Sequence, residues 1–231
     1  MSKRKPPLEP QLTTLWDYPS QHYGQGTQGS ARYRGATPSY VIWNLLSRYT
    51  RQGDVVVDPM CGSGTTLDVA ADLGRTAYGF DLQPQRKEIQ LADARQIPLE
   101  DDSADFVFID PPYSTNLKYS DDPRCIGKLS AAGSDYFEAL ADVYEEAYRI
   151  LKNRRYIAIY ICDVWNKKDG FLPIGASTMM QLSQYFRLVD HVSVVRHNKN
   201  LKMNNHRKAA QDGNFFLRGF NHLIIGKKHE D

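Results

Sequence analysis

The stretch that decides the fold reads DVVVDPMCGSGTT over residues 54–66. Its three consecutive valines predict a short strand buried on both faces of a parallel sheet. The strand ends at Asp58-Pro59, a glycine turn follows over 61–64, and a helical pattern begins at Thr65. A strand, a glycine turn and a helix form the nucleotide-binding half of an open α/β sheet, where glycines let the backbone approach a ligand. The turn alone is weak evidence, because it lacks the third glycine of the dinucleotide fingerprint and the Gly-Lys-Ser/Thr of a phosphate loop.

A second motif follows about 50 residues downstream. Residues 105–113 read DFVFIDPPY, which predicts another buried strand that ends in Asp110-Pro111-Pro112-Tyr113. Taken alone, this motif could be a proline-stiffened loop with a packed tyrosine. Two such strand ends in one chain indicate instead that both loops serve one site, since the carboxyl ends of parallel strands share an edge.

The pair of motifs, DPMCGSGTT at 58–66 and DPPY at 110–113, resembles the amino-methyltransferases of nucleic acids that use S-adenosylmethionine. These are the DPPY-type DNA N4-cytosine and N6-adenine methylases and the related RNA N4-cytidine methyltransferases. The resemblance covers roughly residues 35–165. It implies an α/β, Rossmann-like class I methyltransferase fold, with a mostly parallel seven-stranded sheet and helices on both faces. It also implies S-adenosyl-L-methionine as cofactor and nucleic acid, RNA or DNA, as partner.

Residues at the ends of the predicted strands are candidates for holding the cofactor. Asp81 lies about 20 residues beyond the glycine turn, where an acidic residue accepts hydrogen bonds from two ribose hydroxyls. Asp93, with the backbone of Ala94, follows a short strand near 88–91, a place that commonly faces the adenine amino group in this fold. For both aspartates an ordinary solvated loop residue is the alternative. Thr37 and Pro38 predict a helix start with Thr37 as N-cap, and the resemblance implies contact with the methionine part of the cofactor. The predicted cofactor set is Thr37, Pro38, Asp58, Pro59, Met60, Cys61, Gly62, Gly64, Thr65, Thr66, Asp81, Asp93 and Ala94.

The expected reaction is direct methyl transfer from a sulfonium to an exocyclic amino group. That nitrogen is a poor nucleophile, so acceptors that draw on its hydrogens would aim its lone pair at the methyl group. Asp110 supplies a carboxylate acceptor and the Pro111 carbonyl a second, while Pro111 and Pro112 stiffen the turn. Tyr113 offers a flat face to a base taken out of its stack. Methylation of cytosine C5 would need a cysteine nucleophile, and Cys61 in the cofactor turn is poorly placed for that.

Two domain-level expectations follow from composition. Residues 1–35 should form an irregular, Pro- and Gly-rich N-terminal arm, ahead of a single methyltransferase domain over 36–231. The arm interleaves aromatic residues such as Trp16 and Tyr33, and it either packs on the domain surface or covers the cofactor or substrate as a lid.

The chain is 41% hydrophobic and 24% charged, as in soluble globular proteins, and no apolar run approaches the ~20 residues of a membrane span.

Cysteines and histidines predict no metal site. The three cysteines have no ligand spacing, and an odd, patternless count fits a reducing, cytoplasmic setting. His197 and His206 lack cysteine partners at the spacing of a zinc site.

Basic residues are unevenly distributed, although the net charge is only +2. They gather at 3–5, at Arg32 and Arg34, and above all over 196–208. The connection 114–134 is long and leaves the DPPY motif directly, so we expect it to hold the target nucleotide. The segment 196–214 lies between the last two predicted strands. Its basic residues favour contact with nucleic acid, and a solvated hairpin tip is the alternative. The candidates are Asn116, Lys118, Tyr119, Arg124, Arg196, Lys199, Lys202, Arg207 and Lys208.

The motifs leave the substrate open between DNA and RNA and between cytosine N4 and adenine N6. RNA such as ribosomal RNA is favoured here, because no segment is long enough for a large target-recognition region once the sheet is complete. The alternatives are a sequence-specific DNA modification methylase that acts with a partner protein, an N-methyltransferase of a protein or small amine, and a non-catalytic module that has kept the fold.

Overall fold

The computed structural model describes residues 5, 7–18 and 20–229, so the predicted basic residues Lys3 and Arg4 lie outside the described part. Its strands are β1 (Leu15–Trp16), β2 (Val55–Asp58), β3 (Thr76–Asp81), β4 (Ile89–Leu91), β5 (Ala104–Ile109), β6 (Leu151–Ile161), β7 (Val164–Asn166), β8 (Gly170–Leu172), β9 (Arg187–Val195) and β10 (Phe220–Lys227). Its α-helices are α1 (Ser39–Tyr49), α2 (Thr65–Asp72), α3 (Ser134–Ile150), α4 (Ile174–Leu182) and α5 (Asn204–Asp212). Three short 3₁₀ helices complete the set: η1 (Ser114–Asn116), η2 (Ile126–Lys128) and η3 (Lys199–Lys202).

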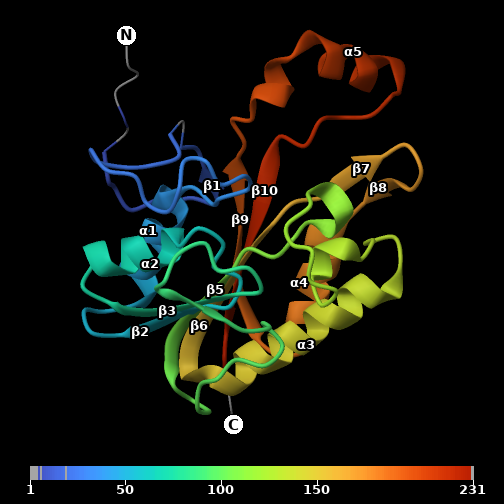
Figure 1. Ribbon diagram of the computed structural model, residues 1–231. Helices are drawn as coiled ribbons and strands as arrows, with labels where there is room; N and C mark the ends of the chain where they lie inside the picture. Colours follow the sequence, from blue (N-terminus) through green and yellow to red (C-terminus); the bar gives the residue numbers. More distant parts are fainter. Residues whose placement is uncertain (1–4, 6, 19, 230–231) are drawn as a thin grey trace.

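One central sheet has the order β1-β9-β10-β6-β5-β2-β3-β4, with helices on both of its faces (Figure 1). The strands β4, β3, β2, β5 and β6 are mutually parallel, whereas β10 runs antiparallel to both β6 and β9. The predicted α/β architecture with a mostly parallel sheet is therefore confirmed, and β1 adds an eighth strand to the seven expected.

The strand directions bring the predicted motifs to one edge of the sheet. Asp58 and Asp81 end β2 and β3, and Asp110 directly follows β5. Because β9 is antiparallel to β10, which is antiparallel to β6, β9 also ends at this edge. We call the side of the sheet at which these strands end the carboxyl edge. The segment 196–219 between β9 and β10 leaves the sheet there, on the same side as Asp110.

Successive side chains of β5 pack alternately into two apolar clusters, one on each face of the sheet. Val107 and Ile109 belong to the apolar cluster that contains α3 and α4, whereas Phe106 and Phe108 belong to the cluster that contains α1. Successive side chains of a strand point to opposite faces, so an uninterrupted apolar run such as 106–109 requires cover on both. All four side chains are buried.

The N-terminal arm is less irregular than predicted. Its residues 15–16 form β1, which pairs in parallel with β9. Trp16, Tyr18 and Tyr23 are buried in the same cluster as α1, and the Tyr18 ring stacks on Tyr40 with 4.9 Å between centroids. This part of the arm is therefore a piece of the core.

One local prediction was wrong, and two elements were not expected. Helix α1 begins at Ser39, and Pro38 precedes it with an extended ψ of 129°, so Thr37 is not the N-cap. The hairpin β7–β8 after Asp163 was not expected. Nor was α5, which occupies part of the segment that read as a loop.

Candidate active site

The glycine turn is organised by Asp58. Its buried carboxylate accepts hydrogen bonds from the Thr66 hydroxyl at 2.5 Å and from the Met60 N–H at 3.1 Å. Burial raises the pKa of Asp58 to about 7, although both hydrogen bonds act in the opposite direction. Since Asp58 ends β2 and Thr66 lies in the first turn of α2, this carboxylate fixes the angle between strand and helix.

Asp81 ties the turn to the end of β3. One of its carboxylate oxygens accepts the Gly62 N–H at 2.8 Å, and the other accepts the Gln83 N–H at 2.8 Å. An ionised carboxylate oxygen can accept about two hydrogen bonds, so each oxygen keeps a free acceptor position.

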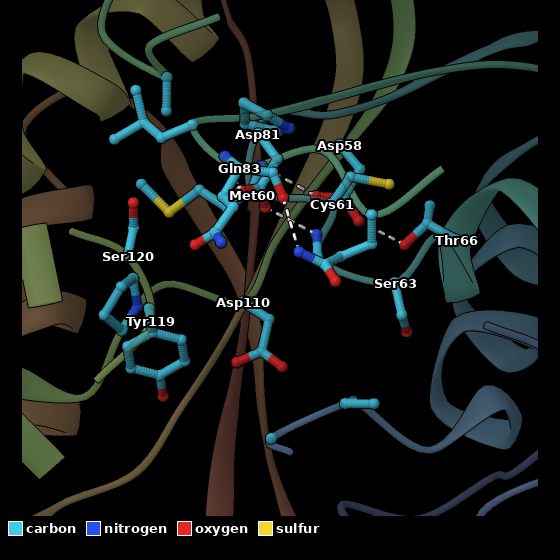
Figure 2. Close-up of a pocket in the computed structure, with 18 of the residues that line it drawn as sticks. Asp58, Met60, Cys61, Ser63, Thr66, Asp81, Gln83, Asp110, Tyr119 and Ser120 are labelled. Atoms are coloured by element: carbon cyan, nitrogen blue, oxygen red, sulfur yellow. Dashed lines mark hydrogen bonds between the residues drawn. The ribbon is translucent and has the colours of Figure 1, made fainter. Parts of the chain in front are cut away.

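A cavity with about 970 Å³ of free space, its open mouth included, lies at the carboxyl edge beside β2, β3, β4 and β5. Figure 2 shows Asp58, Asp81 and Asp110 around this hollow, with Tyr119 and Ser120 on another wall. We call it the first cavity. Most of the predicted cofactor set lines it: Thr37, Asp58, Pro59, Met60, Cys61, Gly62, Thr65, Thr66, Asp81, Asp93 and Ala94.

Two predicted residues, Gly64 and Pro38, are not part of that lining. Gly64 has a φ of +85°, and a Cβ there would meet the Arg86 guanidinium at 2.9 Å, so this position needs glycine for reasons within the fold. Pro38 lines a different cavity, described below.

Tyr33, which was expected only as one of the aromatic residues of the arm, lies against the glycine turn. A Cβ on Gly62 would lie 2.9 Å from the Tyr33 ring, so the ring of this arm residue covers the turn. Tyr33 lines the first cavity together with Gln83, Gln85 and Ser120, which were missed. Gln83 could have been proposed from its place two residues after Asp81, whereas no motif marks Tyr33.

Asp93 lines the first cavity, but its carboxylate already accepts hydrogen bonds from a neighbouring residue. Arg95 donates to both carboxylate oxygens, at 2.9 and 2.7 Å. Burial alone would raise the pKa of Asp93, but the hydrogen bonds and charge of Arg95 outweigh it and leave that pKa lowered. Asp93 is therefore held as an anion at the wall of the cavity.

Asp110 is fixed from both sides. The Thr37 hydroxyl donates to one carboxylate oxygen, and the Tyr113 hydroxyl donates to the other at 2.8 Å. Burial raises the pKa of Asp110 to about 7, opposed by these hydrogen bonds and reinforced by the negative charge of Asp58. The side chain of Thr37, predicted to cap a helix, thus positions the central carboxylate.

The rest of the DPPY turn is also held in place. The Pro112 carbonyl accepts the Tyr136 hydroxyl at 2.8 Å and the Ser114 N–H at 3.0 Å. Ser114 has a φ of +56°, a left-handed conformation that side chains rarely adopt. The Pro111 carbonyl receives no hydrogen bond from the described residues, so it stays available as an acceptor.

A second cavity, of about 830 Å³, adjoins the first. The arm residues Gly35 and Ala36 line both cavities, while Tyr113 and Tyr160 form aromatic walls of the second. Asn221, on β10, lines it too and is only 7% exposed, yet its amide oxygen finds no hydrogen-bond partner among the described residues. A buried acceptor without a donor is costly, so this atom points to a ligand with an N–H or O–H group.

The predicted nucleic-acid contacts fall into three places. Tyr119 and Arg124 line the first cavity, and Arg196 lines the second. Lys118 lies in a groove beside Arg32 and Arg34 and forms an ion pair with Asp121 at 2.6 Å. The others are exposed: Asn116, Lys199, Lys202, Arg207 and Lys208.

Over the described ranges, no group of three metal-ligating side chains comes together. The same residues contain no helix long and apolar enough to cross a membrane.

Comparison with known proteins finds matches to methyltransferases. A family model described as a DNA methylase, N6_N4_Mtase, matches residues 1–92, which include the glycine turn and Asp81 and end before the DPPY motif. A type II methyltransferase of Streptococcus pneumoniae, M2.DpnII, is 38% identical over 52 residues, 22% of this chain and 19% of the relative. Another from Methanothermobacter thermautotrophicus, M.MthZI, is 37% identical over 54 residues, 23% of this chain and 15% of the relative. The matches therefore span less than a fifth of either relative.

Solved structures share the fold at low sequence identity. TrmN from Thermus thermophilus superposes with a TM-score of 0.55 at 18% identity, over 84% of this chain and 50% of TrmN. The [4+2]-cyclase SpnF superposes with a TM-score of 0.56 at 13% identity, over 88% of this chain and 87% of the cyclase. Because a cyclase shares it, the fold does not specify the reaction. The chain therefore has the class I methyltransferase fold, and its residues 1–92 are similar to the N6_N4_Mtase family of DNA methylases.

Proposed function

We propose that this protein transfers a methyl group from S-adenosylmethionine to the exocyclic amino group of a nucleic-acid base, cytosine N4 or adenine N6. The observation that carries the proposal is the position of Asp110. Its carboxylate lines the first cavity, and both of its oxygens are oriented by hydroxyl groups. Tyr113, which holds one of those oxygens, lines the second cavity, so the acceptor group stands where the two cavities approach each other.

The residues of the first cavity fit the cofactor. Asp81 keeps a free acceptor position on each oxygen for the two ribose hydroxyls. Ala94 and Asp93 would face the adenine ring, and Met60 and Ile126 add apolar surface to the cavity. When bound, the cofactor supplies a methyl group activated by its sulfonium. The chain orients that group and shields it from water.

The second cavity fits the acceptor base. Tyr113 and Tyr160 offer flat aromatic walls for a base taken out of its stack. Asp110 would accept one hydrogen of the amino group, and the free Pro111 carbonyl would accept the other. The positive charge that develops on nitrogen would then meet acceptors that are already in place. The buried amide of Asn221 would hold another polar edge of the substrate.

A nucleic-acid substrate is favoured over a protein or small amine by the cations around both cavities. Arg124 and Arg196 stand at their walls, and the exposed Arg32 and Arg34 lie in the neighbouring groove. We propose RNA as the first substrate to examine and DNA, the substrate class in the family model's description, as the second.

The test is incubation with labelled S-adenosylmethionine and, separately, purified ribosomal RNA and genomic DNA, followed by nucleoside analysis. Label in N4-methylcytidine or N6-methyladenosine would identify an RNA enzyme, and label in the deoxynucleosides a DNA enzyme. Asp110→Ala is the matched control and should give neither. Label in protein, or in no fraction, would contradict the proposed substrate class.

A further inference from the structure

Two insertions at the carboxyl edge contact each other. The hairpin β7–β8 leaves β6, and the segment 196–219 joins β9 to β10. The Trp165 ring stacks on Phe215 with 3.6 Å between centroids and 10° between planes, and the Arg218 guanidinium lies 5.1 Å from the centre of the Phe171 ring. Residues 164–172 and 196–219 therefore form one unit, which we call the lobe. Figure 1 shows α5 standing well away from the sheet at the end of this unit.

The lobe concentrates positive charge. It contains eight Lys and Arg residues and two Asp, a net charge of +6, whereas the whole chain carries +2. The remaining residues therefore carry −4. Among the described residues, no Lys or Arg of the lobe lies within ion-pair distance of a carboxylate. Uncompensated cations gathered on one projection create a local positive potential that attracts polyanions.

Aromatic rings are exposed within this positive surface. Phe216 is 87% exposed and Phe171 is 51% exposed, whereas Trp165 and Phe215, which stack on each other, are partly covered. A single exposed apolar residue needs no explanation. Two exposed phenylalanines among uncompensated cations match the pattern of proteins that bind single strands, in which bases stack on rings while phosphates meet Lys and Arg.

The lobe is continuous with the second cavity. Arg196, His197 and Asn198 begin the lobe and line that cavity together with Tyr113. The Arg196 guanidinium also donates to the Cys162 sulfur at 2.8 Å, which anchors the base of the lobe to the end of β6. A strand lying on the lobe would thus lead toward Asp110.

We propose that the lobe binds an unpaired stretch of the nucleic-acid substrate, with bases on Phe171 and Phe216 and phosphates on its Lys and Arg side chains, and so presents the acceptor base to the second cavity. This rests on the proposed function and names its substrate more closely. Unpaired strands are selected because in a duplex the base faces are already stacked on one another and cannot cover the two rings.

Fluorescence anisotropy with a labelled 20-nucleotide RNA tests the proposal, with the same strand as DNA and as an RNA duplex for comparison, all without cofactor. The double variant Phe171→Ala/Phe216→Ala should bind the single strands more weakly, by a factor of about five or more for each ring removed. The slope of its log affinity against log salt should not change. The variant Lys199→Gln/Lys202→Gln/Arg207→Gln/Lys208→Gln should flatten the slope of log affinity against log salt by about 3. Met180→Ala removes a 72% exposed side chain of α4, outside the lobe, and should change neither.

If the double variant Phe171→Ala/Phe216→Ala binds like the unaltered protein, the proposal that bases stack on these rings is overturned. Equal binding of duplex and single strand would overturn it too. Binding of neither RNA nor DNA would overturn it as well and assign the surface to a protein partner. Since Phe171 and Phe216 are exposed, unchanged thermal unfolding of the double variant verifies that it folds. The test is independent of catalysis: single-strand binding that depends on the two rings, without methyl transfer to either nucleic acid, would contradict the proposed function alone.

Discussion

At the scale of single residues, the roles proposed for Asp110 and Asp81 can be tested separately. Asp110→Ala should lower the rate of transfer about 10²- to 10³-fold, because the amino group loses a preorganised acceptor. The dissociation constant for S-adenosylmethionine, measured by calorimetry, should stay within about twofold. Asp81→Ala should instead weaken cofactor binding about 10- to 100-fold, since hydrogen bonds to a charged group are lost. An equal loss of rate and affinity in the Asp110 variant would refute the catalytic role.

The pKa of Asp110 also predicts how activity depends on pH. Only the ionised carboxylate accepts hydrogen bonds with both oxygens, so the transfer rate should rise as the pH passes about 7. Thr37→Val removes a hydrogen bond that lowers this pKa and should move the rise to higher pH. Thr37→Ser keeps a hydroxyl and serves as the matched control. A Val variant with an unshifted pH profile would show that Thr37 does not set the ionisation of Asp110.

The same ionisation affects stability. In the unfolded chain Asp110 titrates near its ordinary pKa of 3.8, whereas burial raises it to about 7 in the fold. Between these values the folded state holds a proton that the unfolded state has lost, so this group makes the fold less stable as the pH rises from about 4 to 7. Asp110→Asn cannot ionise. Its free energy of unfolding, relative to the unaltered protein, should therefore increase over that interval in urea titrations at several pH values. A constant difference would contradict the raised pKa.

At the scale of elements, the two residues of β1 offer a matched pair. Trp16 is 5% exposed and donates from its indole N–H to the Thr13 carbonyl at 2.8 Å, whereas Leu15 is 61% exposed. Trp16→Ala should lower the free energy of unfolding by about 3–5 kcal/mol, because the vacated space lies in the core around α1. Leu15→Ala should change it by less than about 0.5 kcal/mol. Equal effects in denaturant titrations would mean that the arm is not part of the core.

Helices and strands with a local pattern of apolar residues were predictable from the sequence. Those that depend on contacts with residues far along the chain were not. The run over 104–109 matches β5, because a strand covered on both faces needs a continuous apolar sequence. The start of α1 was misplaced because the Thr37 hydroxyl bonds to Asp110, 73 residues away, and does not cap the helix. Helix α5 buries only Ala210, and its sequence contains few apolar residues from which a packed helix could be predicted. Its neighbour Phe215 stacks on Trp165, a contact that local sequence does not reveal.

The site divides in the same way. Asp81 and Asp110 were predictable because a strand end and a motif mark them. Asn221 belongs to no recognisable motif at the start of β10, and the pairing of β10 with β6 and β9 places it at the second cavity. Tyr33 reaches the glycine turn through the course of the arm. Such residues belong to the site by tertiary structure alone.

At the scale of the whole molecule, the arm lies against both cavities. The Gly29 N–H donates to Asp68 of α2 at 2.7 Å, and the Ser30 N–H donates to the Ser63 hydroxyl of the glycine turn at 3.1 Å. Tyr33 then covers Gly62, and Gly35 and Ala36 form a wall common to both cavities. Cofactor and acceptor base would therefore contact the same segment, 28–36, from two sides. This geometry favours the lid alternative for that part of the arm, while residues 15–23 belong to the core.

A segment that lies against both cavities should become more rigid when one is filled. Hydrogen exchange measured with and without S-adenosylmethionine should show slower exchange of the amides in 28–36, because opening of this segment would expose the bound cofactor. The amides of 157–161 in the buried part of β6 should exchange equally in both states and serve as the internal control. Tyr33→Ala should reduce the protection and speed cofactor release in stopped-flow measurements, since the ring that covers the turn is gone. Protection confined to the glycine turn, with 28–36 unchanged, would show that the arm is a fixed wall and that the cofactor enters past it without any opening.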